Sequence, residues 1–134
     1  MDDLLFIDEQ FDDEERMIRD SVARFVQNDV IPLMPDAFEQ AIFPPELIQK
    51  SAKLGLLGLT LPAQYGGSEA SSVAYGLVCQ ELERGDSGLR SFVSVQSSLC
   101  MYPIYRFGNE EQRERFLPAM SRGELIGCFG LTEP

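Results

Sequence analysis

The sequence predicts an all-α fold, a helical bundle that leads into one short β-strand. Three observations support this prediction. Apolar residues recur at helical spacing in five segments, and capping residues, prolines or glycines bound each segment. One apolar run, residues 125–130, precedes a polar turn and is typical of a strand. The length of 134 residues is that of a single domain.

The first helix is expected to begin at Asp12, a favourable N-cap residue. Glu15 lies three residues later and completes a capping-box pattern. Pro32 and Pro35 are expected to end this helix. The apolar residues at helical spacing behind the cap are Met17, Ile18, Val22, Phe25, Val26 and Val30.

A second, shorter helix is expected between the proline pair at 44–45 and Gly55, which suits a helix end. A loop over residues 56–67 follows. The third helix is expected to start at Ser71 or Ser72, since serine favours the N-cap position.

Residues 85–88, Gly-Asp-Ser-Gly, interrupt the helical pattern, and a fourth helical stretch is expected over about 89–101. Asn109 is the predicted N-cap of a fifth helix, with Gln112 at the reciprocal position and Pro118 late in the helix. The buried stripe expected on the fourth stretch consists of Phe92, Val95, Leu99 and Tyr102.

The strand predicted over residues 125–130 has no sequence after it with which to pair. A strand needs partners for its backbone donors and acceptors. We therefore expect the chain to be the front part of a larger protein. On this interpretation residues 1–124 form a helical domain, and residues 125–134 form the first strand of a β-domain outside the chain.

The net charge of -11 argues against a nucleic-acid partner, which would require clustered Lys and Arg. Acidic residues crowd the first twenty positions, whereas presequences are Arg-rich and acid-poor. No secretory signal or membrane span is apparent. We expect the cytoplasm as the location, or the mitochondrial matrix if a presequence has been removed.

Three widely spaced cysteines, Cys79, Cys100 and Cys128, indicate buried thiols in a reducing compartment and no metal site. The sequence contains no histidine. Its absence excludes Ser-His-Asp and Cys-His catalysis and His-ligated zinc within these residues.

Charged residues flank the glycine pair at 85–88. Glu83, Asp86 and Arg90 would lie near the ends of two helices there. One interpretation is ordinary capping by Asp86 or Ser87, with Arg90 in solvent. The other is that Arg90 faces a pocket and binds a carboxylate, which its planar guanidinium can hold with two hydrogen bonds.

Hydroxyl groups line one face of the fourth helical stretch. Ser91, Ser94 and Ser98 fall at positions i, i+3 and i+7. Such a face is either a close helix contact or the wall of a polar cavity. Further along, residues 129–132 would expose backbone groups and one hydroxyl at a strand end, where a planar heterocycle could bind.

From about Asp12 onward the chain resembles the acyl-CoA dehydrogenase family, whose N-terminal domain is a helical bundle. The segments that carry the resemblance are 55–62 (GLLGLTLP), 65–67 (YGG), 108–112 (GNEEQ), 116–118 (FLP), 123–124 (GE) and 129–134 (FGLTEP). The resemblance implies FAD as cofactor. It also implies that Phe129, Gly130, Leu131, Thr132, Glu133 and Pro134 contact the flavin.

A narrower resemblance is to the glutaryl-CoA dehydrogenases, through residues 72–77, 81–84, 86–91, 94–99 and 127–134. It implies that Arg90 and Ser91 hold the distal carboxylate of the substrate. Ser94 would supply a pocket hydroxyl, and Glu83 would join a polar network beside the acyl chain. A buried arginine would be unfavourable in an enzyme for monocarboxylic chains.

The resemblance further implies oxidation and decarboxylation of glutaryl-CoA to crotonyl-CoA and CO2. It implies an electron-transferring flavoprotein as acceptor and a homotetramer. The family's catalytic glutamate lies in another domain, so no catalytic residue is expected in this chain. Two alternatives stay open: a dehydrogenase or oxidase for another acyl-CoA, and a free-standing helical interaction module.

Overall fold

The computed structural model describes residues 5–130, and within this range the chain is helical without a β-strand. The all-α prediction is confirmed. The first half contains η1 (Ile7–Gln10), α1 (Asp13–Phe25), η2 (Val26–Val30), η3 (Ile31–Leu33), α2 (Met34–Glu39) and α3 (Glu46–Lys53). The second half contains η4 (Ala63–Tyr65), α4 (Ser72–Gly85), α5 (Ser87–Ser94), η5 (Val95–Met101), α6 (Tyr102–Phe107) and α7 (Glu110–Ser121).

Both predicted capping boxes are present. Glu15 N donates to Asp12 Oδ1 at 2.8 Å, and Asp12 N donates to Glu15 Oε2 at 3.2 Å. Asn109 and Gln112 make the same reciprocal pair at the start of α7, with both distances 2.9 Å. Ser71 is the N-cap of α4. These boundaries were predictable because each depends on contacts within four residues.

The first helix does not end at Pro32 as the sequence suggested. Helical structure continues from α1 through η2, η3 and α2 to Glu39. Pro32 and Pro35 occupy the second positions of η3 and α2, where a missing N–H leaves no hydrogen bond unmade. The prolines therefore redirect the helix and do not terminate it.

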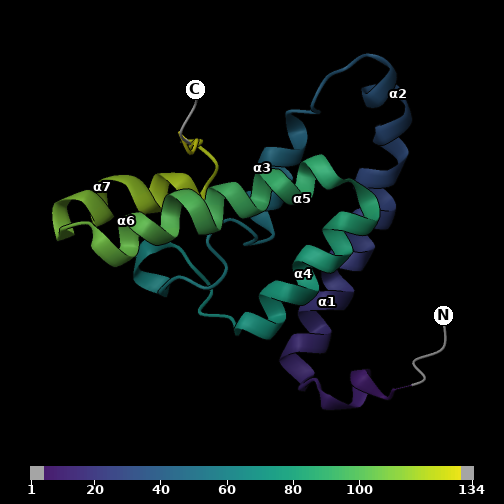
Figure 1. Ribbon diagram of the computed structural model, residues 1–134, viewed down its shortest axis with the longest axis horizontal. Coiled ribbons are helices and arrows are strands. Elements are labelled where there is room, and N and C mark those ends of the chain that lie inside the picture. Colours follow the sequence, from purple (N-terminus) through teal and green to yellow (C-terminus); the bar gives the residue numbers. More distant parts are fainter. Residues whose placement is uncertain (1–4, 131–134) are drawn as a thin grey trace.

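Helices α5, η5 and α6 join into one long rod, residues 87–107 (Figure 1). The buried stripe predicted on it is half right: Phe92 and Val95 pack against the core, but Leu99 is 42% exposed and Tyr102 is 48% exposed. η5 is a π-helical segment, whose wider turns shift the phase of every following side chain. The residues buried along the rod are Leu89, Val93, Gln96, Ser97, Cys100 and Met101.

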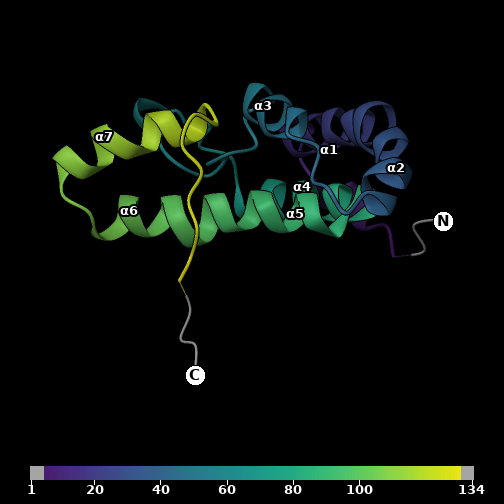
Figure 2. The ribbon, with the colours of Figure 1, turned by 90° about the horizontal axis from the view of Figure 1, so that it is seen from above.

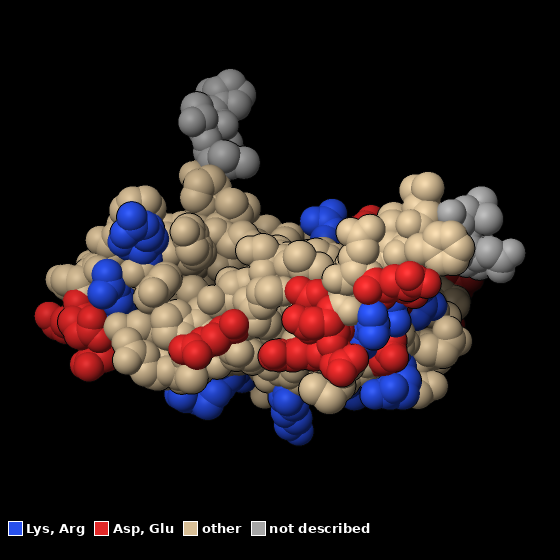
Figure 3. Space-filling model, turned by 90° about the horizontal axis from the view of Figure 1, so that it is seen from below, with Lys and Arg blue, Asp and Glu red and all other residues tan. Residues whose placement is uncertain are grey.

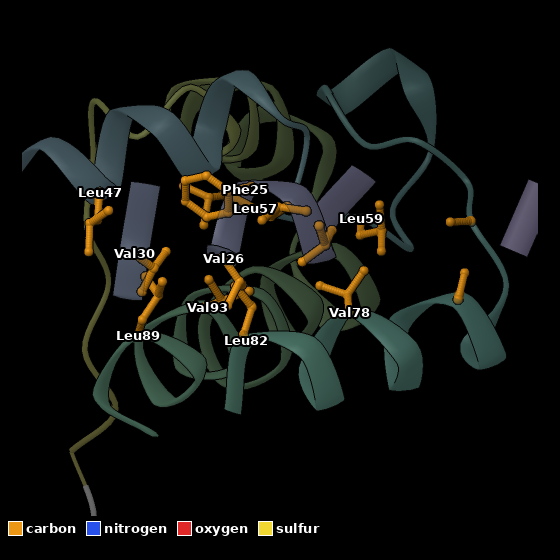
Figure 4. Close-up of a cluster of buried hydrophobic side chains, with 14 residues drawn as sticks. Phe25, Val26, Val30, Leu47, Leu57, Leu59, Val78, Leu82, Leu89 and Val93 are labelled. Atoms are coloured by element: carbon orange, nitrogen blue, oxygen red, sulfur yellow. The ribbon is translucent and has the colours of Figure 1, made fainter. Parts of the chain in front are cut away.

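The helices form two layers, seen from above in Figure 2. One layer holds α4, α5 and α6, and the other holds α1, α2, α3 and α7. The main core lies between them, where side chains from α1, η2, α3, α4, α5 and the loop at 56–59 point toward one another (Figure 4). A smaller cluster around Met101 and Leu117 fills the space beneath α6 and α7.

The strand predicted over 125–134 is not formed by residues 125–130, because the described part of the chain offers no partner strand. The other four residues of that prediction, Leu131 to Pro134, lie outside the described range. Residues 125–127 instead cross the long rod. Gln96 Nε2 donates to Leu125 O at 2.8 Å, and Gly127 N donates to Gln96 Oε1 at 2.8 Å. No helix within residues 5–130 is long and apolar enough to cross a bilayer.

Candidate functional site

The turn between α4 and α5 positions the candidate site. Asp86 is the N-cap of α5 and accepts a hydrogen bond from Leu89 N at 2.6 Å. A Cβ atom on Gly85 would lie 2.7 Å from Val26 Cγ1, so the turn packs closely against η2. Leu82 and Leu89 are fully buried on either side of the turn. This packing leaves the polar residues of both helices on one solvent-facing side.

Four polar side chains meet beside this turn, and we refer to Glu83, Ser87, Arg90 and Ser94 as the Arg90 cluster. Arg90 Nε donates to Glu83 Oε2 at 2.6 Å, and Arg90 Nη1 donates to Ser94 Oγ at 3.3 Å. Ser87 Oγ donates to the other Glu83 oxygen, Oε1, at 2.6 Å. Ser94 Oγ donates to Ser91 O at 3.1 Å. The structure thus joins Arg90, Glu83 and Ser94, whereas Ser91 takes part through its carbonyl group.

The guanidinium group of Arg90 is partly engaged. Its side chain is 35% exposed, and Nη2 has no hydrogen-bond partner within residues 5–130. The hydrogen bond with Glu83 raises the pKa of Arg90, and the same bond lowers the pKa of Glu83. Arg90 is therefore a partly exposed cation held at Nε and Nη1, and the helix cap by Asp86 that the first interpretation expected is also present.

The polar surface extends along α4 beyond the cluster. Tyr75, Cys79 and Glu83 are spaced by four residues and share one face of that helix. The Tyr75 hydroxyl lies 2.8 Å from Ser98 Oγ, in contact with the long rod. Burial raises the pKa of both the Tyr75 hydroxyl and the Cys79 thiol. Tyr75 was not predicted as a site residue, although its spacing of eight residues from Glu83 was a usable signal.

The sequence offered two roles for the serines of the long rod, polar surface and close packing, and the structure shows both. Ser98 contacts Tyr75 of α4, and Ser94 accepts from Arg90 of its own helix. Ser97, one position away, is buried and makes the close contact. Its Oγ accepts from Gly58 N at 3.0 Å and donates to Leu56 O at 3.4 Å. The face with Ser94 and Ser98 is therefore polar surface, whereas Ser97 makes the close packing contact, with Leu56 and Gly58 of the loop.

The cysteines differ from the expectation of three buried thiols. Cys100 is buried, Cys79 is half-buried and Cys128 is exposed, and all three are free. Residues 5–130 contain no group of three or more His, Cys, Asp or Glu residues arranged to hold a metal ion.

The end of the described chain has features that suit a planar ligand. The Phe129 side chain is 48% exposed, and Gly130 is exposed beside it. Within the described range, the backbone groups of residues 128–130 make no hydrogen bond to the rest of the chain. An aromatic ring next to free backbone donors and acceptors fits a heterocycle such as a flavin.

Charge on the surface is mixed on the face seen from below. Acidic side chains gather over one half of this face, with basic ones among them, and no broad basic patch appears there (Figure 3). Within residues 5–130 several basic groups form ion pairs, including Arg84 with Glu81 and Arg19 with Asp8. This face therefore lacks the basic stripe that a nucleic-acid backbone would require.

The fold and the Arg90 cluster together define a helical domain with a candidate carboxylate-binding site. Residues 12–124 match the family model described as acyl-CoA dehydrogenase, N-terminal domain. The chain therefore belongs to the acyl-CoA dehydrogenase family. It is 37% identical over 121 residues to an acyl-CoA dehydrogenase of Bacillus subtilis, a match that covers 90% of this chain and 32% of the relative.

Two solved structures are similar over nearly the whole chain. A glutaryl-CoA dehydrogenase from Mycobacterium smegmatis in complex with FADH2 is 49% identical with a TM-score of 0.93, covering 98% of this chain and 34% of that one. A chain from a structure of the electron transferring flavoprotein of Acidaminococcus fermentans is 35% identical with a TM-score of 0.88, covering 92% and 33%. The chain thus spans about a third of the length of these relatives.

Proposed function

We propose that the full-length protein is an FAD-dependent dehydrogenase that oxidises and decarboxylates glutaryl-CoA to crotonyl-CoA and CO2. The observation that carries the proposal is the state of Arg90: Nε and Nη1 are held by Glu83 and Ser94, while Nη2 is free. The free Nη2 group carries two N–H donors, and the permanent positive charge of the guanidinium favours a carboxylate as their acceptor. The similarity to the glutaryl-CoA dehydrogenase of M. smegmatis supports the same substrate.

The distal carboxylate is what separates glutaryl-CoA from a fatty acyl-CoA of similar length. Enclosing this charge without a partner would be costly, and a positioned arginine removes that cost. In the proposed complex Arg90 binds the carboxylate through Nη2, Ser94 and Ser91 lie beside the carboxylate, and Glu83 stays paired with Nε of Arg90. A monocarboxylic chain would leave the free edge of Arg90 unpaired and would bind less well.

The flavin contacts are proposed at the C-terminal end of the chain, from Phe129 and Gly130 through Leu131, Thr132 and Glu133 to Pro134. The exposed ring of Phe129 and the unpaired backbone beside it support this placement. When bound there, the flavin supplies an acceptor for the hydride that leaves the β-carbon of the substrate. Gln96 fixes the approach of this segment through its bonds to Leu125 and Gly127.

The remaining parts of the activity are assigned to the rest of the full-length protein. The base that removes the α-proton is a glutamate outside this chain. An electron-transferring flavoprotein accepts the electrons, and the full-length protein assembles as a homotetramer in the cytoplasm. Within this chain the proposed roles are substrate binding and the first contacts to the flavin.

Substitution of Arg90 in the full-length protein tests the proposal. Arg90→Met should lower kcat/KM for glutaryl-CoA about 100-fold, since a lost charged hydrogen-bond pair costs roughly 2 to 3 kcal/mol. Turnover of butyryl-CoA should be unchanged or improved. Arg84→Met is a matched control, because Arg84 is an exposed arginine paired with Glu81 at 2.9 Å on the neighbouring helix. Equal losses with both substrates, or none with glutaryl-CoA, would contradict the proposal and favour a dehydrogenase for another acyl-CoA.

A further inference from the structure

The carboxylate of Glu83 is held at both of its oxygen atoms. Oε2 accepts from Arg90 Nε at 2.6 Å, and Oε1 accepts from Ser87 Oγ at 2.6 Å. Ser87 is the first residue of α5, directly after the N-cap Asp86. Because Asp86 caps the helix, the hydroxyl of Ser87 is free for this contact with Glu83.

This arrangement limits how Glu83 meets Arg90. A carboxylate next to a guanidinium favours two parallel hydrogen bonds, which on this edge would come from Nε and Nη2. Only the bond from Nε is formed, and Oε1, the oxygen that would accept from Nη2, is instead drawn toward Ser87 by its 2.6 Å hydrogen bond. Nη1 meanwhile donates to Ser94 Oγ at 3.3 Å. Nη2 is thereby left without an acceptor in the described part of the chain.

We infer that Ser87 is a positioning residue that keeps Glu83 on the Nε side of Arg90, so that the Nη2 edge stays available to the distal carboxylate of the substrate. Without the Ser87 hydroxyl, Glu83 can rotate to bind Arg90 through both oxygens and compete with the substrate. This inference rests on the proposed function. It assigns Ser87 an effect on substrate binding through Glu83, with no contact to the substrate itself.

The test uses steady-state kinetics of the full-length, FAD-loaded protein with glutaryl-CoA and butyryl-CoA. Ser87→Ala should raise KM for glutaryl-CoA about five-fold with kcat unchanged, because the lost binding is remote from the reacting atoms. KM for butyryl-CoA should not change. Ser87→Thr keeps the hydroxyl and should restore KM. Ser72→Ala is the matched control, since Ser72 is the first residue of α4 directly after the N-cap Ser71.

A double-mutant cycle separates this role from a structural one. In a Glu83→Ala background, Ser87→Ala should cause no further change in KM, because its effect acts through Glu83. An unchanged KM for glutaryl-CoA in Ser87→Ala, an equal rise with butyryl-CoA, or the same rise in the Glu83→Ala background would overturn the inference. If Arg90→Met still abolishes the preference for glutaryl-CoA in that case, the proposed function stands. If Arg90→Met leaves the preference intact, both fail.

Discussion

Ser71 Oγ donates a 2.6 Å hydrogen bond to Glu15 Oε1 and so joins the first turns of α1 and α4, which are far apart in sequence. Each residue also has a local task. Glu15 closes the capping box of α1, and Ser71 accepts from Ala74 N at 2.9 Å as the N-cap of α4. Two helix starts therefore share one hydrogen-bonded network, which fixes the relative position of the helices that carry the main core.

Ser71→Ala should lower the free energy of unfolding by about 2 kcal/mol, because it removes a cap and leaves an oxygen of the buried Glu15 carboxylate without its donor. Urea denaturation followed by circular dichroism measures the change. Ser72→Ala, one residue later and fully in solvent, should alter the free energy by less than about 0.5 kcal/mol. If both variants changed the free energy of unfolding equally, the hydrogen bond to Glu15 would contribute nothing to stability.

Gln96 is 1% exposed and holds the C-terminal segment through three hydrogen bonds, to Met120 O, Leu125 O and Gly127 N. Gln96→Leu should destabilise the protein by about 2 kcal/mol and speed hydrogen exchange at the Gly127 amide. Gln49→Leu is the control, because Gln49 makes a single bond, to Gly123 O. If the Gly127 amide exchanged at the same rate in both variants, the segment would be held by other contacts.

Two glycines should respond in opposite directions to the same substitution. A Cβ on Gly67 would collide with the carbonyl of Leu61, which is backbone and cannot turn aside. Gly67→Ala should cost about 3 kcal/mol of unfolding free energy. Gly76 lies on the exposed side of α4 with nothing near its Cβ position, and Gly76→Ala should gain about 1 kcal/mol from helix propensity. Thermal unfolding of both variants checks the sign, and a loss of stability in Gly76→Ala would contradict the helix assignment there.

The Glu83 carboxyl should titrate below its ordinary pKa of 4.5, because the hydrogen bonds from Arg90 first, and then Ser87, favour its charged form. Its pairing therefore stabilises the folded state above about pH 4.5, and this stabilisation is lost as the pH falls through the lower, folded-state pKa. Carbon-13 NMR titration of the side chain measures the shift. Arg90→Met should remove most of the downward shift in the pKa of Glu83, and Ser87→Ala should remove a smaller part. A larger effect of Ser87→Ala would show that the serine is the main cause of the shift.

The helix starts could be predicted because the deciding contacts are local. Asp12, Asp86 and Asn109 each cap a helix through a backbone N–H three residues later. The buried stripe of the long rod could not be predicted, because the π-helical turns of η5 shift the phase that regular spacing assumes.

Part of the candidate site was also visible in the sequence. Arg90 and Glu83 stood out as charges beside a glycine pair, and their hydrogen bond is present in the structure. The role of Ser87 was not visible, because its hydroxyl could equally have capped the helix. Only the folded turn, in which Asp86 takes the cap, shows that Ser87 reaches Glu83.

The sequence by itself determined the all-α class, the places where helices begin and the residue types available for binding a carboxylate, since these depend on local spacing and side-chain chemistry. Tertiary structure decided which nitrogen of Arg90 has no partner within residues 5–130, that Ser97 is buried while Ser94 contacts Arg90, and that residues 125–127 lie across the rod on Gln96. These outcomes depend on atoms brought together from distant parts of the chain by burial of the shared core, and no local pattern encodes them.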